Sequence, residues 1–264
     1  MTAIEGVAEL ASRIRPVVQV LGGKFMTSPE LAAVEAEAGL PPRSLYLRGR
    51  SAVLGDVPPK VAAELFGIFP HWLFEFVLPP AVAVLDAPAA VRAYAESSAR
   101  WSRVSLSAVS DPGRLADLLF RVVDAADASA LALFAGWKNA ERPSGDVERL
   151  GFALMVVREL RGGLHFAALR ALGLSVPEAV IADPEGGRER LLRTAWPEDA
   201  ANELTAAAGR KPDLRDRWRR AESMTDARMG ELLASALTGP QRAELDRRLA
   251  ELAAFAQLPG SPTA

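Results

Sequence analysis

The chain contains two histidines, and each lies beside residues that could support proton transfer or ligand binding. His71 is part of the aromatic segment GIFPHWLFEF, and Glu75 follows it four residues later. In a helix these two side chains share a face, so we expect a hydrogen bond that orients and charges the imidazole. The pair could then act as general acid and base inside an aromatic pocket. The alternative is an aromatic core helix that holds one hydrogen-bonded histidine.

The second histidine, His165, follows Gly162-Gly163 at the predicted start of a short helix. The positive end of a helix disfavours imidazolium, so we expect this histidine to be neutral. It could contact a ligand, or serve as an acid or base in the same cavity as His71 and Glu75. A local capping contact is the alternative. His71, Glu75 and His165 are therefore the candidate catalytic residues.

A tyrosine and two arginines form another group that could bind a ligand. Tyr46 and Arg50 are four residues apart, with Arg48 between them. A hydroxyl, a guanidinium fork and a ring face together suit an anionic or aromatic ligand, whereas a solvated basic helix face is the alternative. With the aromatic segment, this group predicts a small-molecule site. Its predicted contacting residues are Tyr46, Arg50, Phe66, Phe69, His71, Trp72 and His165.

The densest basic stretch, residues 210–220, could contact a phosphate backbone. Asp213 and Asp216 dilute it, and a solvated face with internal salt bridges is the alternative. No spacing in the chain suggests a metal site, and no Walker, dinucleotide-binding or Gly-x-Ser-x-Gly motif is present. We therefore expect no cofactor and no metal.

The elements that must position these residues are predicted to be helices. Apolar residues recur at helical spacing through most of the chain. Strand-like alternation is nearly absent, and short β segments could form only near residues 53–54 and 179–181. Helices are predicted to begin at capping residues Ser28, Asp111 and Thr238. The predicted fold class is all-α, with at most minor β structure.

The same order of features occurs twice along the chain. VVQVLGG at 17–23 matches VVRELRGG at 156–163, and each is followed by a short alanine-rich helix and a glycine turn. Each half closes with a capped amphipathic helix, at 110–126 and 238–254. Helices are predicted to stop at Gly22-Gly23, Gly39, Gly162-Gly163 and Gly173.

This repeat divides the chain into two units. Residues 1–137 would form the first helical unit, and residues 147–258 would form the second. The polar segment KNAERPSGD at 138–146 is the predicted linker. Residues 259–264 would form a flexible tail.

Within each unit the order of helices resembles a helix-turn-helix core. Residues 217–255 resemble the C-terminal helical region of MarR-type winged-helix regulators, and Leu204-Thr205 with Gly209 resembles the strand and wing that precede it in that family. The whole chain is also similar to an actinobacterial family of helix-turn-helix-like proteins. The segments that carry this similarity are YLRGRSAVLGDVPPKVAAELF at 46–66 and RELRGGLHFAALRALGL at 158–174.

MarR-type proteins are two-fold dimers, so the resemblance implies tandem winged-helix-like units that form an intrachain pseudo-dimer. It also implies DNA binding, for which Arg43, Arg48 and Arg50 of the first unit are the candidates. The predicted recognition helix of the second unit, residues 176–183, is acidic and apolar and suits no base edge. We therefore rank small-molecule binding with a regulatory role first. A cofactor-independent enzyme of specialised metabolism comes second, and a sequence-specific DNA-binding regulator third.

Composition narrows the expected partners further. The net charge is −2, so the chain lacks the basic excess of strong nonspecific nucleic-acid binders. It contains no cysteine, and neither a secretory signal nor a membrane-spanning stretch is recognisable, so we expect a soluble cytoplasmic protein. The predicted assembly is a monomeric pseudo-dimer or a homodimer that binds a small organic ligand.

Overall fold

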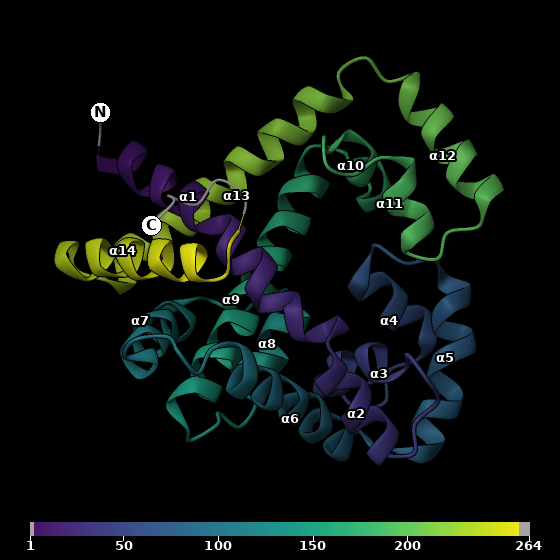
Figure 1. Ribbon diagram of the computed structural model, residues 1–264. Coiled ribbons are helices and arrows are strands. Elements are labelled where there is room, and N and C mark those ends of the chain that lie inside the picture. Colours follow the sequence, from purple (N-terminus) through teal and green to yellow (C-terminus); the bar gives the residue numbers. More distant parts are fainter. Residues whose placement is uncertain (1–2, 259–264) are drawn as a thin grey trace.

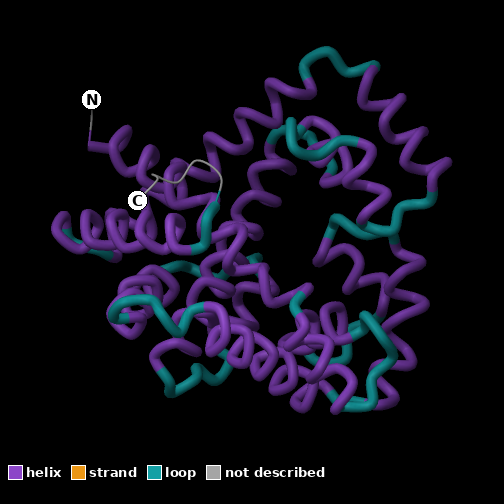
Figure 2. The backbone as a smooth tube through the Cα atoms, in the orientation of Figure 1, coloured by secondary structure: helices purple, strands orange, loops and turns teal. Residues whose placement is uncertain are grey.

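A computed structural model describes residues 3–258, which are helical and contain no strand. Figure 2 shows these helices joined by loops along the whole described chain. The helices of the first half are α1 (Ala3–Lys24), α2 (Pro29–Glu37), α3 (Leu45–Ser51), α4 (Pro59–Phe66), α5 (His71–Val84), α6 (Ala87–Ser105), α7 (Pro112–Ala125) and α8 (Ala132–Lys138), with 3₁₀ turns at Phe25–Thr27 and Ala52–Leu54. Those of the second half are α9 (Asp146–Ala171), α10 (Val176–Ala182), α11 (Arg188–Arg193), α12 (Glu198–Gly209), α13 (Leu214–Ala236) and α14 (Gly239–Phe255). The predicted all-α class is confirmed.

The local signals at helix starts were informative, whereas the suggested β segments do not form. Ser28, Asp111 and Thr238 each accept a hydrogen bond from a backbone N–H of the first helical turn, as predicted. Residues 53–54 lie in a 3₁₀ turn and residues 179–181 lie in α10. In both segments, where short β structure was predicted as possible, helical hydrogen bonds pair the backbone N–H and C=O groups.

Two of the four predicted glycine stops are confirmed. Gly39 and Gly173 follow α2 and α9 with φ angles of 70° and 64°, a left-handed conformation that glycine adopts without strain. Gly22-Gly23 and Gly162-Gly163 lie within α1 and α9 instead. The predicted short helix that begins near His165 is therefore wrong, because α9 continues through it.

Gly22 has a packing function that explains its place inside a helix. A Cβ atom at Gly22 would lie 2.5 Å from the carbonyl oxygen of Leu154 on α9. The missing side chain therefore lets the backbones of α1 and α9 approach closely. Around Gly162, in contrast, a Cβ atom would meet nothing within 4 Å.

The central helix of the fold is α9 (Figure 1). It packs against α1, α6, α7, α8 and α13, and its residues 150–157 are all buried. The largest cluster of buried apolar side chains draws on both ends of the described chain, from Leu10 to Ala253. Hydrophobic burial around α9 therefore joins the two predicted units in one core.

Contacts between the two halves are reciprocal. α1 packs on α13 of the second half, and α9 packs on α6 of the first half; α14 likewise packs on α1, and α7 packs on α9. Two-fold-related halves produce such an exchange. The division into units 1–137 and 147–258 stays a prediction, and these contacts support it. The predicted linker, 138–146, overlaps the loop between α8 and α9, and the predicted tail, 259–264, lies outside the described residues.

The predicted strand and wing are helical, because Leu204, Thr205 and Gly209 all lie in α12. Instead, the third helix of each half is followed by two further helices joined by a turn, α4 with α5 and α12 with α13 (Figure 1). The α4–α5 turn is docked on the second half, since the Trp196 indole N–H donates to the Ile68 carbonyl at 2.8 Å. The α12–α13 turn lies at the other end of α12 from this contact.

The apolar helices are each too short or too polar to cross a membrane. No single described helix has the length and the composition of a membrane span. α5 with α6, and α9 with α10, meet both requirements only as pairs that are bent by 101° and 94°. The apolar residues of α9 lie in the core described above.

Candidate functional site

The predicted Tyr46–Arg50 group forms, and a residue from the second half closes it. Arg50 donates from Nε and Nη2 to the two carboxylate oxygens of Glu159, each at 2.8 Å. Its Nη1 donates to the Tyr46 hydroxyl at 3.1 Å. The side chains of Arg50 and Glu159 are only 12% and 3% exposed. An internal carboxylate therefore already occupies the guanidinium fork that was predicted to bind a ligand.

Burial and the partner's charge shift the pKa values of Arg50 and Glu159 in opposite directions. Burial disfavours ionised Glu159, but the charge and hydrogen bonds of Arg50 outweigh it and hold the pKa of Glu159 below its ordinary value. Burial also opposes the charge of Arg50, and Glu159 outweighs it and raises the pKa of Arg50. The pair is thus a charged internal link between α3 and α9. Burial raises the pKa of the neighbouring Tyr94, whose buried hydroxyl has no hydrogen-bond partner among the described residues.

The predicted aromatic cavity is filled by its own side chains. Four rings pack edge to face or tilted, with centroids 5.1 to 6.3 Å apart, namely Tyr46, Phe66, Phe69 and Phe74. The Arg50 guanidinium lies 4.4 Å from the Phe66 centroid. Trp72, which was predicted to line the same cavity, is 46% exposed on α5. These residues form a packed cluster with an exposed neighbour, rather than the lining of the predicted cavity.

His71 and Glu75 do not form the predicted pair. His71 is the first residue of α5, and its Nε2 lies 3.0 Å from Oε1 of Glu64 on α4. Glu75 faces Lys60 at 3.8 Å. Both His71 and Glu75 are about half exposed, so neither has the desolvated setting that tunes a catalytic acid or base.

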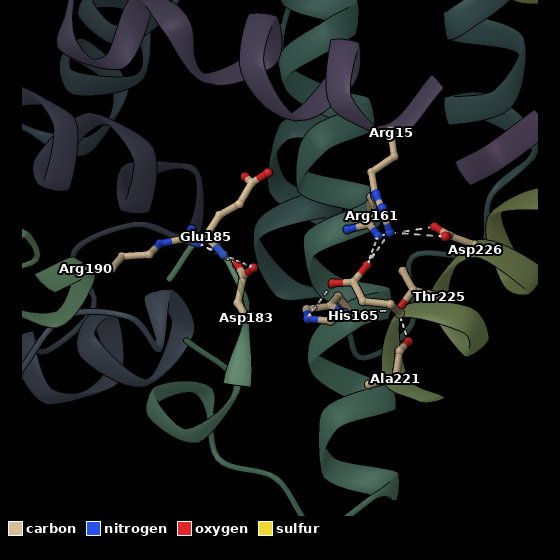
Figure 3. A network of polar contacts seen from close by, with 10 residues as sticks. Arg15, Arg161, His165, Asp183, Glu185, Arg190, Ala221, Thr225 and Asp226 are labelled. Carbon is tan, nitrogen blue, oxygen red and sulfur yellow. Dashed lines mark hydrogen bonds and ion pairs between the residues drawn. The ribbon is translucent and has the colours of Figure 1, made fainter. Parts of the chain in front are cut away.

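His165 belongs to a buried polar network at the junction of α1, α9 and α13 (Figure 3). Arg161 donates to Glu222 at 2.6 Å and to Asp226 at 3.2 Å. Arg15 of α1 reaches the same two carboxylates, at 2.9 Å and 3.3 Å. Two cations and two anions therefore balance one another across three helices. His165 and His71 have no partner in common, so the predicted shared acid/base cavity is not formed by these contacts.

Both ring nitrogens of His165 lie near polar side chains of α13. The Thr225 hydroxyl donates its single proton to the Ala221 carbonyl at 2.7 Å. Nδ1 of His165 lies 3.1 Å from the same hydroxyl oxygen, and Nε2 lies 3.6 Å from Oε1 of Glu222. Burial lowers the pKa of His165 and outweighs the raising effect of Glu222. The direction of this shift favours the predicted neutral form, with burial rather than a helix terminus as the cause.

This lowered pKa makes stability depend on pH. Between the folded pKa of His165 and its ordinary value of 6.5, the unfolded chain binds more protons than the folded chain. We expect the free energy of unfolding to fall as the pH falls below 6.5, by at most about 1.4 kcal/mol per pH unit for one proton. Glu222 and Glu159, whose pKa values are lowered, add their losses only below their ordinary value of 4.5. Urea unfolding of the wild type and of His165→Gln measures the slope, and an equal slope in both between pH 4.5 and 6.5 would assign it to other groups.

Two of the three predicted DNA-contacting arginines are internal. The Arg48 side chain is 2% exposed, donates to the Leu85 carbonyl at 3.0 Å and 2.8 Å, and pairs with Asp56 at 2.6 Å. Arg50 is held by the internal ion pair described above. Arg43 is exposed in the turn before α3. Since α3 cannot present Arg48 or Arg50 to a DNA groove, that part of the DNA prediction is wrong.

In the second half, α9 continues through the predicted short helix, so the helix after it is only the second helix of this half. The predicted recognition helix, residues 176–183, corresponds to α10 (Val176–Ala182), and a further helix, α11, follows it. The turn between them ends at Gly187, with a φ angle of 78°. The sequence signal that marks α11 is the Gly186-Gly187 pair before RERLLR. α11 carries three arginines that the prediction missed, Arg188, Arg190 and Arg193.

A basic surface lies at the α12–α13 turn, at the top of Figure 1. Five exposed cations make up this surface, which we call the basic tip: Arg210, Lys211, Arg215, Arg219 and Arg220. Lys211 pairs with Glu178, and Arg219 pairs with Asp216. The other three cations of the tip form no ion pair with any described residue. They are therefore available to an external anion.

Residues 9–258, nearly the whole described chain, match the model of a helix-turn-helix family. The chain belongs to this helix-turn-helix family. No curated protein and no solved structure matches it. Membership of the helix-turn-helix family confirms the predicted relationship in its general form. The MarR-type tandem arrangement and the actinobacterial origin stay predictions.

The surface of the described chain carries open hollows. One hollow, of about 640 Å³, runs along α12 from Trp196 to Arg210. Another, of about 400 Å³, lies between α6 and the loop at 139–145. Neither is lined by the residues predicted to bind a ligand. The described residues also contain no group of three or more histidines and carboxylates placed to hold a metal ion.

Proposed function

We propose that this helix-turn-helix family member is a regulator that binds double-stranded DNA, with the basic tip on the phosphate backbone. The observation that carries the proposal is a set of exposed arginines without a carboxylate partner among the described residues, Arg210, Arg215 and Arg220. Binding of such free guanidinium groups to phosphate releases counterions from DNA, which favours association. Family membership supports the same function.

The position of the tip fits this function. In helix-turn-helix proteins the second helix of the pair enters the major groove, and flanking segments contact the backbone. α11 is the second helix here, and α12 connects it directly to the tip. Arg188 pairs with Glu198 and Arg190 pairs with Asp183. We therefore assign most of the proposed affinity to the tip and less to base contacts by α11.

The described residues of the first half offer no counterpart of the basic tip for DNA binding. Its α3 arginines are internal, and its α4–α5 turn is docked against Trp196. The proposed DNA contact is therefore one-sided within a single chain. The packed aromatic cluster gives no support to the predicted small-molecule site, and the separated histidines give none to the enzyme alternative. A cytoplasmic location belongs to this proposal, because a DNA regulator must reach the chromosome.

Fluorescence anisotropy with a labelled duplex of random sequence tests the proposal. The triple variant Arg210→Glu, Arg215→Glu, Arg220→Glu is expected to bind roughly tenfold or more weakly at low salt. The slope of log affinity against log salt concentration should also become shallower by about 3, since each lost phosphate contact lowers it by about one. Circular dichroism checks that the helix content is unchanged.

The matched control carries the same change in net charge outside the tip. Its three substitutions are at exposed residues of α7, α13 and α14: Arg121→Glu, Arg228→Glu and Arg247→Glu. This variant is expected to keep most of the wild-type affinity and salt slope. Equal losses in the two triple variants, or no duplex binding by the wild type at low salt, would contradict the proposal.

A further inference from the structure

The outer side of α5 carries an apolar surface. Of the eight large apolar side chains that are exposed among the described residues, four lie on α4 and α5, namely Val61, Trp72, Phe76 and Val84. Phe76 is 75% exposed. Trp72, Phe76 and Pro79 follow one another at helical spacing and form one stripe. We call this stripe, with Pro80, Val84 and Val61, the α5 face.

We infer that the α5 face is the interface of a homodimer, in which α5 packs antiparallel on α5 of a second copy. In such a pair a two-fold axis at the level of residue 76 places the two Phe76 side chains opposite each other and position 72 of each copy opposite position 80 of the other. The two Phe76 rings would then pack on each other, which is a favourable aromatic pairing, and Trp72 of each copy would pack on Pro80 of the other. Isologous contacts require a surface that complements itself in this way.

The backbone of α5 adds polar self-complementarity. Pro79 and Pro80 lie inside the helix and have no N–H, so the carbonyls of Glu75 and Phe76 lack their usual helical donors. The indole N–H of Trp72 is a donor on the same exposed face. Antiparallel pairing brings the Trp72 of one copy to the turn of the other copy that holds these carbonyls. Each copy therefore supplies both the donor and the acceptors.

The area of the face suits a weak dimer. The rings of Trp72 and Phe76 expose roughly 250 Å² together, since a whole aromatic side chain covers about 150–250 Å². With the flanking valines and prolines, each copy would contribute on the order of 500 Å². A pair would then bury about 1,000 Å², the lower limit for a specific interface. We expect dimerisation in the micromolar range.

The charges beside the face favour a second copy over a lipid surface. The polar residues of α4 and α5 next to the face carry both signs: Lys60 lies beside Glu75, and Glu64 lies beside His71. Anionic membranes attract faces that are bordered by cations, whereas mixed signs can pair across a two-fold axis. Pairing would also give the dimer two basic tips, as two-fold readers of DNA half-sites need. This last point alone rests on the proposed DNA binding.

Sedimentation velocity of the full chain, from low to high micromolar concentration, tests the dimer. The wild type is expected to move from monomer to dimer over this range, and Phe76→Glu is expected to stay monomeric with unchanged helix content. Val104→Glu is the matched control, because Val104 is 69% exposed on α6, outside the face. It should dimerise like the wild type. A wild type that is monomeric throughout, or equal dissociation of both variants, would overturn the inference.

Cross-linking locates the interface independently of stability and of DNA binding. The chain has no cysteine, so Glu75→Cys provides a single thiol beside the face. A short bismaleimide is expected to join two copies of this variant and to leave Glu251→Cys, on α14, uncrosslinked. Equal cross-linking of both would contradict pairing through α5. A monomer that co-sediments with phospholipid vesicles would assign the face to a lipid surface and also overturn the inference.

Discussion

Replacement of Glu159 by alanine is expected to lower the free energy of unfolding by about 3–5 kcal/mol. The substitution leaves the buried Arg50 guanidinium without its carboxylate. Arginine does not lose its proton under folding conditions, so deprotonation cannot relieve the uncompensated charge. The contact between α3 and α9 would then enclose an unpaired cation. Urea denaturation, followed by circular dichroism, measures the loss.

Two further variants separate the ion pair from general effects of truncation. Glu251→Ala breaks an exposed pair with Arg247 on α14 and is expected to change stability little, because water and salt screen that pair. The double variant Arg50→Met, Glu159→Leu is expected to recover most of the loss, since apolar replacements of a buried pair are often neutral. If Glu159→Ala costs no more than Glu251→Ala, the pair does not hold α3 to α9.

The Arg50–Glu159 ion pair shows which contacts the spacing of residues within one helix cannot predict. Tyr46 and Arg50 are four residues apart on one helix, so their spacing places them on one face, where they form a hydrogen bond. Glu159 lies 109 residues after Arg50, and the spacing within either segment gives no sign that α9 passes α3. The chemistry of the group was therefore predictable, whereas the carboxylate that closes it to a ligand depends on tertiary packing.

The same limit explains the wrong pairing of His71. The four-residue rule assumes that a side chain turns along its own helix. His71 is the first residue of α5, and the turn at residues 67–70 brings α4 alongside it, so Glu64 of α4 competes with Glu75 and is the residue paired. Where the end of one helix lies beside another helix, a side chain can pair with a residue of that second helix, which the spacing within its own helix does not predict.

Helix starts were easier to predict than the order of helices. A capping residue such as Ser28 acts within a few residues, so its effect is visible in sequence. The second-half recognition helix was placed at 176–183 because that segment follows the glycine turn at Gly173. A further turn, which ends at Gly187, leads from α10 into α11, the helix that we propose as the second of the pair. One missed turn thus hid the arginines of α11.

Gly22→Ala is expected to lower the free energy of unfolding by about 1–3 kcal/mol, the usual cost of overfilling a packed site. The new Cβ atom would lie 2.5 Å from the carbonyl oxygen of Leu154, and backbone on α9 cannot move aside as a flexible side chain can. The better helix propensity of alanine offsets this only in part, by roughly 0.5–1 kcal/mol. Thermal and urea denaturation would both show the loss.

Gly162→Ala is the matched substitution in the repeated motif, and we expect the opposite sign. Gly162 lies inside α9, has no atom within 4 Å of its would-be Cβ, and does not have a positive φ angle. Alanine there should stabilise the protein by roughly 0.5–1 kcal/mol, because glycine loses more backbone freedom in a helix. Two glycines at the same place in the repeat thus differ because only Gly22 lies where the two repeated helices cross. Equal effects of the two substitutions would contradict a close crossing of α1 and α9 at Gly22.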